Sequence, residues 1–290
     1  MSSAPAEPAE PATCDLAGLA RRRAIAEAIA REAADCLLGF RGRLTSVGWK
    51  GEVDLVTEAD RTTERLILDA LRRLLPEDRV VGEEGGLQGP PEAPFTWYVD
   101  PLDGTTNFVH GLPHFAASLG AAWSAGPDSP PPVLVVGALS APALVGSRED
   151  ACGLTYSAAR GLGATRNGLP IAVAPHTELG RALVATGFPY DRTHTAHALV
   201  GPLERALERC LCVRRLGSAS LDLALVADGT FGAYWEPRLK PWDFAAGAVL
   251  VSEAGGRVTD LSGGQGMLAS GDVLATNGLL HEAFLRDVLA

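Results

Sequence analysis

The chain has 290 residues, of which 47% are hydrophobic and 21% charged, and its formal net charge at pH 7 is −10. This length and apolar content allow one large core or two modest ones. The acidity makes the protein a poor electrostatic match for nucleic acid or an anionic membrane surface, so an anionic small molecule would need a local countercharge such as a metal ion.

The N-terminal segment, the cysteines and the longest apolar run together predict an intracellular protein. Residues 1–14 are rich in Pro, Ala and Glu and lack the regions of a secretory signal, so we predict a flexible tail. The five cysteines are odd in number and scattered, which is typical of reduced thiols. The longest apolar run, 133–146, contains Gly and Pro and is too short to span a bilayer. We therefore expect a cytoplasmic protein without membrane or nucleic-acid partners.

The first half of the chain alternates helical and strand patterns. Apolar residues recur at three- and four-residue steps over 15–40 and 58–75, which predicts two helices, the second ended by Pro76. Four apolar runs predict strands, of which the first enters a glycine-rich turn and the last two are typical of a sheet buried on one or both faces. These runs cover 79–86, 95–100, 114–123 and 133–142.

The second half repeats this alternation after a turn at 166–171. Strands or strand–turn segments are predicted at 181–189, 231–236, 258–263 and 272–277. Helices are predicted at 194–210, 218–228, from Asp243 to the glycines at 255–256, and at 278–289. The pattern predicts an α+β or α/β protein with sheets covered by helices. We expect an N-terminal subdomain over 15–172 and a C-terminal subdomain over 173–290 that share a crevice.

Carboxylates gather at the ends of these elements. Each has an ordinary explanation when taken singly: Asp60 or Asp243 as a helix N-cap, and Glu83 with Glu84 as an acidic surface turn. Gathered at the rim of a buried sheet, they would repel one another and be costly to desolvate. A hard divalent cation such as Mg²⁺ relieves both problems. The residues concerned are Asp54, Asp60, Glu83, Glu84, Asp100, Asp103, Glu236 and Asp243.

The segment WYVDPLDGTTNF, 97–108, carries the clearest signal. The three-residue step from Asp100 to Asp103, with Pro101 fixing the turn, would let both carboxylates and the Leu102 carbonyl face one point. A helix that starts at Gly104 would present its first amides to a phosphate. The segment therefore predicts metal-assisted phosphate chemistry.

These segments resemble the signatures of the inositol monophosphatase family of lithium-sensitive, Mg²⁺-dependent phosphomonoesterases. DPLDGTTNF at 100–108 is similar to the family's DPxDGTxNF, and WDFAAGAVLVSEAGG at 242–256 to its WDxAAGxxxxxEAGG. GEEGG at 82–86 and DLVTEAD at 54–60 match two further family segments. The resemblance covers 15–290 with all four motifs in order, which makes it specific. It implies a layered αβαβα sandwich of the inositol monophosphatase and fructose-1,6-bisphosphatase type, and a homodimer.

The resemblance also implies a set of metal ligands. Glu83, Asp100 and the Leu102 carbonyl would hold a first Mg²⁺. Asp100, Asp103 and Asp243 would hold a second, and Glu83 would help to hold a weaker third. Two or three ions per site would activate a water and clamp the attacking and leaving oxygens. Glu83 also counts among the catalytic residues, and Asp103 and Asp243 among the substrate contacts.

By the same resemblance, Thr105 with Asp60 behind it would orient and activate the attacking water. The amides of Gly104 and Thr105 would hold the phosphate. Glu236 and the backbone at Ser218–Ala219 would contact the hydroxyls of the leaving group. The partner of the site would be a small phosphorylated polyol or sugar.

The resemblance leaves the substrate open. The leading candidate is myo-inositol 1-phosphate, and the family alternatives are histidinol phosphate, fructose 1,6-bisphosphate and 3′-phosphoadenosine 5′-phosphate. Arg192 is the one basic residue of the types Lys and Arg in 186–197, which mildly favours a substrate with a single phosphate. Some relatives are regulatory partners of the transcription or RNA machinery, but the intact ligand set favours an enzyme here. The role of Lys50, just before the DLVTEAD segment, stays open.

Two further features fit several interpretations. The pair Arg214 and Arg215 is compatible with a surface strand, a subunit interface or a substrate contact. His194 and His197 are best explained as the solvated start of a helix, and the six histidines show no other cluster.

Overall fold

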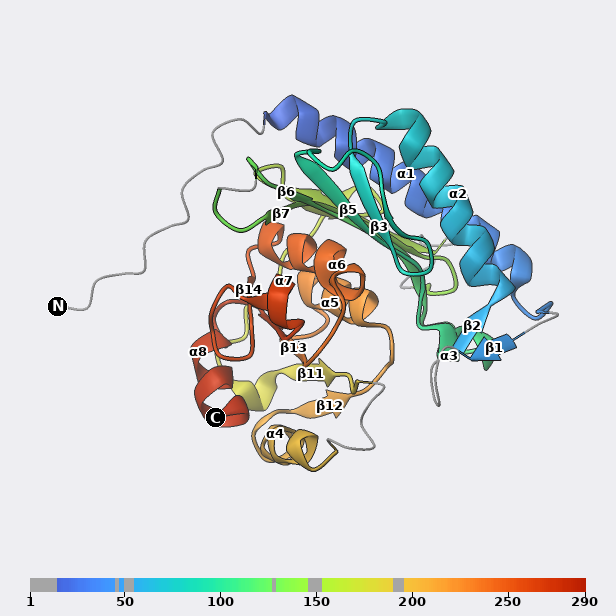
Figure 1. The fold of residues 1–290 in the computed structure, drawn as a ribbon. Helices are drawn as coiled ribbons and strands as arrows, with labels where there is room; N and C mark the ends of the chain where they lie inside the picture. Colours follow the sequence, from blue (N-terminus) through green and yellow to red (C-terminus); the bar gives the residue numbers. More distant parts are fainter. Residues whose placement is uncertain (1–14, 45–46, 50–54, 127–128, 146–152, 190–195) are drawn as a thin grey trace.

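The computed structural model describes residues 15–290 apart from 45–46, 50–54, 127–128, 146–152 and 190–195. Helices and sheets stack in five layers, in the order helix, sheet, helix, sheet, helix (Figure 1). Three clusters of buried apolar residues fill the space between these layers. The structure therefore confirms the αβαβα sandwich expected from the sequence.

The first layer consists of two long helices, the second of which follows a small hairpin. Asp15 caps the first helix by accepting a hydrogen bond from the Gly18 amide. Thr57 caps the second, because its hydroxyl accepts the Ala59 amide at 3.1 Å. These elements are α1 (Leu16–Phe40), β1 (Val47–Trp49), β2 (Leu55–Thr57) and α2 (Glu58–Leu74).

The second layer is an eight-stranded sheet. Its strands are β3 (Arg79–Gly82), β4 (Gly86–Gln88), β5 (Phe95–Asp103), β6 (Ala116–Trp123), β7 (Val133–Ala141), β8 (Leu154–Ala159), β9 (Ala164–Arg166) and β10 (Leu169–Pro170). Their order is β10-β9-β8-β7-β6-β5-β3-β4, in which β3 and β5 are parallel and the other neighbours antiparallel. The helices α1 and α2 cover one face of the sheet (Figure 1). A short helix, α3 (Thr105–Val109), follows β5 directly.

The middle layer consists of α5 (Ala219–Ala227) and α6 (Pro241–Glu253), which lie against the other face of the first sheet (Figure 1). The backbone of α6 approaches β6 and β7 closely. A Cβ on Gly137 would meet the carbonyl oxygen of Ala246 and lie 2.9 Å from its Cα, so only glycine fits at this contact. Because α6 rests on the sheet itself, its N-terminal end has a defined position beside the end of β5.

The last two layers are a five-stranded sheet and its outer helices. The strand order is β12-β11-β13-β15-β14, in which β11 runs parallel to β12 and β13. The strands are β11 (Leu183–Thr186), β12 (Cys212–Arg214), β13 (Ala233–Glu236), β14 (Arg257–Thr259) and β15 (Val273–Thr276). The helices of this part are η1 (Leu179–Arg181), α4 (Ala196–Arg209), α7 (Met267–Ser270), α8 (His281–Phe284) and the π-helical turn η3 (Leu285–Leu289).

Several segments differ from the sequence predictions, and β1, β2, β12 and α7 have no counterpart among them. The stretch 154–170, for which the sequence indicates only a turn at 166–171, forms β8 to β10. Pairing of β8 with β7, of β9 with β8 and of β10 with β9 decides the conformation of these short strands. The helix predicted from Asp243 begins at Pro241, since proline suits the first position of a helix. The terminal helix predicted over 278–289 is divided into α8 and η3.

We propose that the subdomain boundary lies near 172–173, between the end of β10 and the start of β11. The later half is not independent of the first, because α5 and α6 pack on the first sheet. Among the described residues, no helix is both long enough and apolar enough to cross a membrane.

Candidate active site

Asp100 and Asp103 lie at the carboxyl end of β5, where the pairing of β5 with β6 shifts register. Pro101 has no amide to donate to the sheet, which fits an interruption of the ladder at this point. The Leu102 amide instead donates to Asp100 Oδ1 at 2.9 Å. The irregular strand end thus keeps two carboxylates within the same buried region.

Asp60 and Thr105 come from different elements and are joined by a buried hydrogen bond. The Thr105 hydroxyl oxygen lies 3.1 Å from Asp60 Oδ1 and 3.0 Å from the Leu102 carbonyl oxygen, and its single proton is donated to one of these two acceptors. Asp60 Oδ2 accepts from the amide of Thr57 at 2.7 Å and from its hydroxyl at 2.6 Å. Asp60 is therefore the third residue of α2 and not its N-cap. With its proton directed at Asp60 or Leu102, the Thr105 oxygen keeps a lone pair to accept a hydrogen bond from a water.

Glu83 lies on the turn between β3 and β4, and a glutamate of α2 holds the backbone of this turn. Glu64 Oε1 accepts the Glu84 amide at 2.8 Å, and the Glu83 amide donates to the Val99 carbonyl on β5 at 3.2 Å. A Cβ on Gly82 would lie 3.1 Å from Glu64 Cδ, so glycine leaves room for this carboxylate. The turn thereby brings Glu83 next to the end of β5.

Asp243 and Asp103 are tied to the starts of two helices. Asp243 is the third residue of α6, and its Oδ2 accepts the Lys240 amide at 2.7 Å, so it is not an N-cap either. Asp103 Oδ2 accepts from the Ser218 hydroxyl at 2.7 Å, from the Ser220 amide at 2.7 Å and from the Ser220 hydroxyl at 2.6 Å. Both helices direct their N-termini at carboxylates, whose negative charge the helix dipole favours.

Four carboxylates of this region act on one another electrostatically. Burial raises the pKa of the Asp100 carboxyl well above its ordinary value. The negative charges of Glu83, Asp103 and Asp243 raise the pKa of Asp100 further. The pKa of Asp243 is also raised well above its ordinary value. Burial is the largest cause, and the negative charge of Asp103 is the second.

Within the described ranges, no three Asp, Glu, His or Cys side chains are already arranged around one point as a metal site. The donor set nevertheless fits Mg²⁺. Its oxygens are hard ligands, and a dication would relieve the repulsion that raises these pKa values.

A cavity of about 520 Å³ borders this cluster. Six of the predicted site residues line it: Glu83, Asp103, Ser218, Ala219, Glu236 and Asp243. Five others come from the end of β5 and the starts of α2 and α3 and do not line it: Asp60, Asp100, Leu102, Gly104 and Thr105. Lys50, Asp54, Arg192 and His194 fall outside the described residues.

The part of the cavity near the second sheet offers groups that suit hydroxyls. Glu236 ends β13, and the Tyr234 hydroxyl donates to its Oε2. Burial raises the pKa of Glu236 to about 7, although the Tyr234 hydrogen bond acts in the opposite direction. Ser218 and Ala219 are the N-cap and the first residue of α5. A carboxyl group and the backbone at the start of a helix therefore face the same cavity.

The structure also brings together residues that the sequence does not connect. His114 Nε2 lies 3.0 Å from Asp222 Oδ1, and both side chains are buried. Burial raises the pKa of Asp222 to about 6, and His114 partly offsets this. Asn107 Nδ2 donates to the carbonyls of His114 at 2.7 Å and Leu216 at 2.8 Å, which links α3 to the segment before α5. No spacing signal identifies partners more than 100 positions apart.

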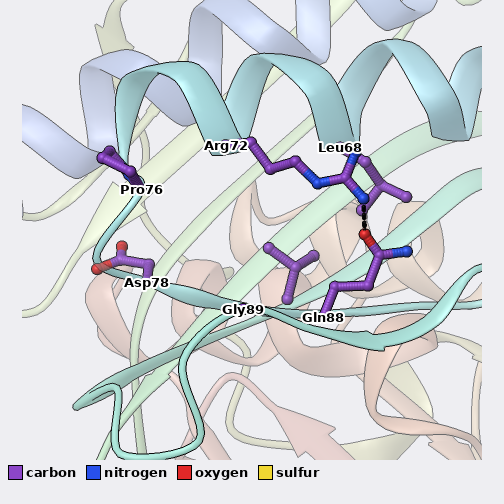
Figure 2. A pocket seen from close by; sticks show the side chains of 7 residues that line it. Leu68, Arg72, Pro76, Asp78, Gln88 and Gly89 are labelled. Carbon is purple, nitrogen blue, oxygen red and sulfur yellow. Dashed lines mark hydrogen bonds between the residues drawn. The ribbon is translucent and has the colours of Figure 1, made fainter.

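A smaller cavity, of about 280 Å³, lies between α2 and the β3–β4 edge of the first sheet (Figure 2). The Arg72 side chain reaches from α2 to Gln88 on β4 and donates a hydrogen bond to it (Figure 2). Asp78 is engaged by a bidentate pair with Arg22, at 2.9 and 2.7 Å, and by the Trp97 indole at 2.9 Å. The polar groups of this cavity already have structural partners, so we assign it no function.

Comparisons with known proteins identify relatives of this chain in sequence and in fold. The model of the family described as "Inositol monophosphatase family" matches residues 18–290. The inositol-1-monophosphatase of Synechocystis sp. is 39% identical over 250 residues, 86% of this chain and 82% of that protein. The Nus factor SuhB of Pseudomonas aeruginosa is 38% identical over 270 residues, 91% of this chain and 94% of that protein. The structure of inositol monophosphatase from Anabaena (Nostoc) sp. PCC 7120 superposes with a TM-score of 0.80 at 36% identity, covering 93% of this chain and 96% of that one.

Proposed function

This chain belongs to the inositol monophosphatase family, a family of phosphomonoesterases, and we propose that it hydrolyses a small polyol phosphate in the presence of Mg²⁺. The leading substrate is myo-inositol 1-phosphate, which would yield inositol and phosphate. The observation that carries the proposal is the buried Thr105–Asp60 hydrogen bond beside a cluster of mutually repelling carboxylates.

In this proposal the carboxylates of Glu83, Asp100, Asp103 and Asp243, with the Leu102 carbonyl, hold two or three Mg²⁺ ions. Bound there, Mg²⁺ supplies positive charge to the phosphate and lowers the pKa of a water. The protein residues arrange the reactants around that charge. We expect each carboxylate to be ionised in the loaded enzyme, because an adjacent cation lowers the pKa that burial has raised.

Thr105 and Asp60 orient the attacking water. The Thr105 oxygen accepts a hydrogen bond from the water, since its own proton is directed at Asp60 or Leu102. Asp60 Oδ1 is an acceptor for the Thr105 hydroxyl. The other carboxylate oxygen, Oδ2, accepts hydrogen bonds from the amide and the hydroxyl of Thr57. We propose that this pair would orient the water for in-line attack on phosphorus, and positioned proton acceptors of this kind contribute about 10²–10⁴-fold in rate.

The remaining residues hold the substrate. The amides of Gly104 and Thr105, at the start of α3, contact the phosphate. Glu236 and the backbone at Ser218–Ala219 contact hydroxyls of the leaving group. The family resemblance also supports a homodimer, which stays a prediction. The name Nus factor belongs to the Pseudomonas aeruginosa relative, and no feature of the described site favours such a role for this chain.

Phosphate release from a panel of phosphomonoesters, with and without Mg²⁺, tests the proposal. The panel contains inositol 1-phosphate, histidinol phosphate, fructose 1,6-bisphosphate and 3′-phosphoadenosine 5′-phosphate. We expect Mg²⁺-dependent turnover, led by inositol 1-phosphate, that Asp103→Asn abolishes because it removes a ligand charge. Asp69→Asn is the matched control, since Asp69 is exposed on α2 and pairs with Arg72.

Folded protein that binds Mg²⁺ but releases phosphate from no member of the panel would contradict the proposal. Activity that persists after chelation of Mg²⁺, or in Asp103→Asn, would contradict the metal-dependent mechanism.

A further inference from the structure

Gly187 follows the last residue of β11 and lies beside the end of β13 in the second sheet. The two strands are parallel, and Thr186 is aligned with Trp235. The next residue along each strand is Gly187 and Glu236, respectively, and both line the cavity of the proposed active site. The register of the sheet therefore sets Gly187 against the side chain that we propose contacts hydroxyls of the leaving group.

The backbone at position 187 does not itself require glycine, because Gly187 is not one of the glycines with a positive φ. The requirement comes from a neighbouring side chain. A Cβ on Gly187 would overlap the Glu236 carboxylate at Cδ and at both oxygens. An alanine could be accommodated only if this carboxylate moved away. The absence of a side chain at position 187 thus leaves the space in which the Glu236 carboxylate lies.

Tyr234 holds one oxygen of the same carboxylate. Its hydroxyl donates to Glu236 Oε2, and both side chains are buried. The two residues are two positions apart on β13, so their side chains lie on the same face of the sheet. No donor among the described residues binds the other oxygen, Oε1. One oxygen therefore has a structural partner, and the other is available to a ligand in the cavity.

The groups around Glu236 act on its charge in both directions. Burial raises the pKa of Glu236 to about 7. The Tyr234 hydrogen bond and the positive charge of Arg215 lower this pKa, whereas the negative charges of Asp222 and Asp103 raise it. Tyr234 and Arg215 therefore favour the ionised carboxylate, which accepts hydrogen bonds from hydroxyls.

We propose that Gly187 and Tyr234 are positioning residues for Glu236, and that they thereby determine how strongly the site selects leaving groups that carry hydroxyls. This inference rests on the proposed phosphatase function and adds the residues that set its specificity. A carboxylate that is already held in one orientation forms charged hydrogen bonds with a hydroxyl at a smaller cost in side-chain entropy. A leaving group without hydroxyls gains nothing from this arrangement.

The test compares inositol 1-phosphate with phenyl phosphate, whose leaving group carries no other hydroxyl, at saturating Mg²⁺. Gly187→Ala should lower the kcat/KM of inositol 1-phosphate relative to that of phenyl phosphate about 10- to 100-fold, because the displaced carboxylate loses its hydrogen bonds to the polyol. Tyr234→Phe should lower the same ratio about 10-fold, since Oε2 of Glu236 is no longer held. In both variants we expect the larger change in KM.

Variants without the carboxylate show whether both residues act through Glu236. In the Glu236→Ala background, a methyl group at position 187 overlaps no carboxylate, so Gly187→Ala should leave the substrate ratio of that background unchanged. Tyr234→Phe should likewise have no further effect there. A residue with only a structural role would change the ratio equally in both backgrounds.

Two matched controls make the same substitutions away from the cavity. A Cβ on Gly180, in η1, would have the Arg209 carbonyl oxygen as its nearest neighbour at 3.8 Å, so Gly180→Ala causes no overlap. The Tyr156 hydroxyl donates to Asp228 Oδ2 at 2.8 Å, and neither residue lines the cavity. We expect Gly180→Ala and Tyr156→Phe to keep the wild-type substrate ratio. Thermal unfolding of each variant monitors the fold.

The outcomes separate this inference from the proposed function. An unchanged ratio in Tyr234→Phe or in folded Gly187→Ala would overturn the positioning role alone, and so would equal effects in the Glu236→Ala background. If Gly187→Ala does not fold, Tyr234→Phe decides. Absence of Mg²⁺-dependent turnover of both substrates by the wild type would overturn the proposed function, and the inference with it.

Discussion

The carboxylate of Glu64 shows how a single residue outside the cavity lining can organise the candidate metal site. The Glu64 carboxylate accepts a hydrogen bond from the Glu84 amide, on the turn that carries Glu83. It lies in the space that a side chain on residue 82 would fill if this residue were not glycine. Residues that hold metal ligands in place are costly to lose, because a loose ligand must be ordered again each time an ion binds.

We therefore predict that Glu64→Ala raises the Mg²⁺ concentration for half-maximal phosphatase activity by about 10- to 100-fold. Glu64→Gln should restore most of the affinity, because its carbonyl oxygen can still accept the Glu84 amide. Mg²⁺ titrations of activity, together with calorimetric titration of Mg²⁺, measure the effect. Equal Mg²⁺ requirements in wild type and Glu64→Ala would show that the Glu64 carboxylate does not position Glu83.

At the scale of elements, the contact of α6 with the first sheet sets the position of Asp243. Gly120 on β6 and Gly137 on β7 both face the backbone of α6 near Ala246. The absence of side chains lets the helix lie directly on the sheet, so that its first turn reaches the end of β5. The family's second signature thus covers the helix α6. Its first turn carries the candidate metal ligand Asp243, and its middle, near Ala246, packs against β6 and β7.

Gly137→Ala should destabilise the protein by about 1–3 kcal/mol, because the added methyl group overlaps the backbone of Ala246. Gly39→Ala, near the end of α1, is the control. A Cβ there meets no atom within 4 Å, and the change should be neutral or stabilising by up to about 1 kcal/mol. Urea unfolding measures both values. Similar unfolding free energies for the two variants would contradict the close packing of α6 on β7.

At the scale of the whole molecule, the C-terminal end is joined to the second sheet through a buried histidine. Thr259 donates its proton to the Asp260 carbonyl at 2.7 Å, so His281 Nε2, 2.9 Å away, must donate to Thr259. In the neutral ring, His281 Nδ1 is then the acceptor for the Thr276 hydroxyl, 3.0 Å away. The pKa of His281 agrees with this neutral form. Burial lowers its pKa from 6.5 to about 4, and the positive charge of Arg257 adds to this effect.

This arrangement predicts a loss of stability in mild acid. Between pH 6.5 and about 4 the unfolded state binds a proton at His281 that the folded state excludes, so the free energy of unfolding falls as the pH decreases. Above pH 6.5 the contribution is fully present. Urea unfolding at pH 7.5 and 5.5 should show that the wild type loses about 1 kcal/mol more than His281→Gln. The exposed His197 provides the control variant His197→Gln, which should behave like the wild type. Equal losses in wild type and His281→Gln would argue against a buried neutral histidine.

The sequence by itself determined the features that depend on neighbours along the chain. Hydrophobic periodicity placed the long helices and the central strands, because the repeat of each element is local. The motifs identified Asp100 and Asp103 as a pair and the family as inositol monophosphatase. The resemblance of the sequence to this family predicted the αβαβα sandwich that the structure has.

The tertiary structure alone decided the features that join distant segments. It added β8, β9 and β10 in succession to the edge of the sheet beside β7. It also joined Glu64 to the turn that carries Glu83, joined His114 to Asp222, and brought Arg215 into the cavity. It also made Asp60 and Asp243 third residues of their helices, where they accept backbone amides. These contacts depend on how layers pack and which backbone groups remain unpaired at the ends of elements. Much of that information is absent from local spacing, because it arises only when different elements pack together, as His114 and Asp222 do across 108 positions.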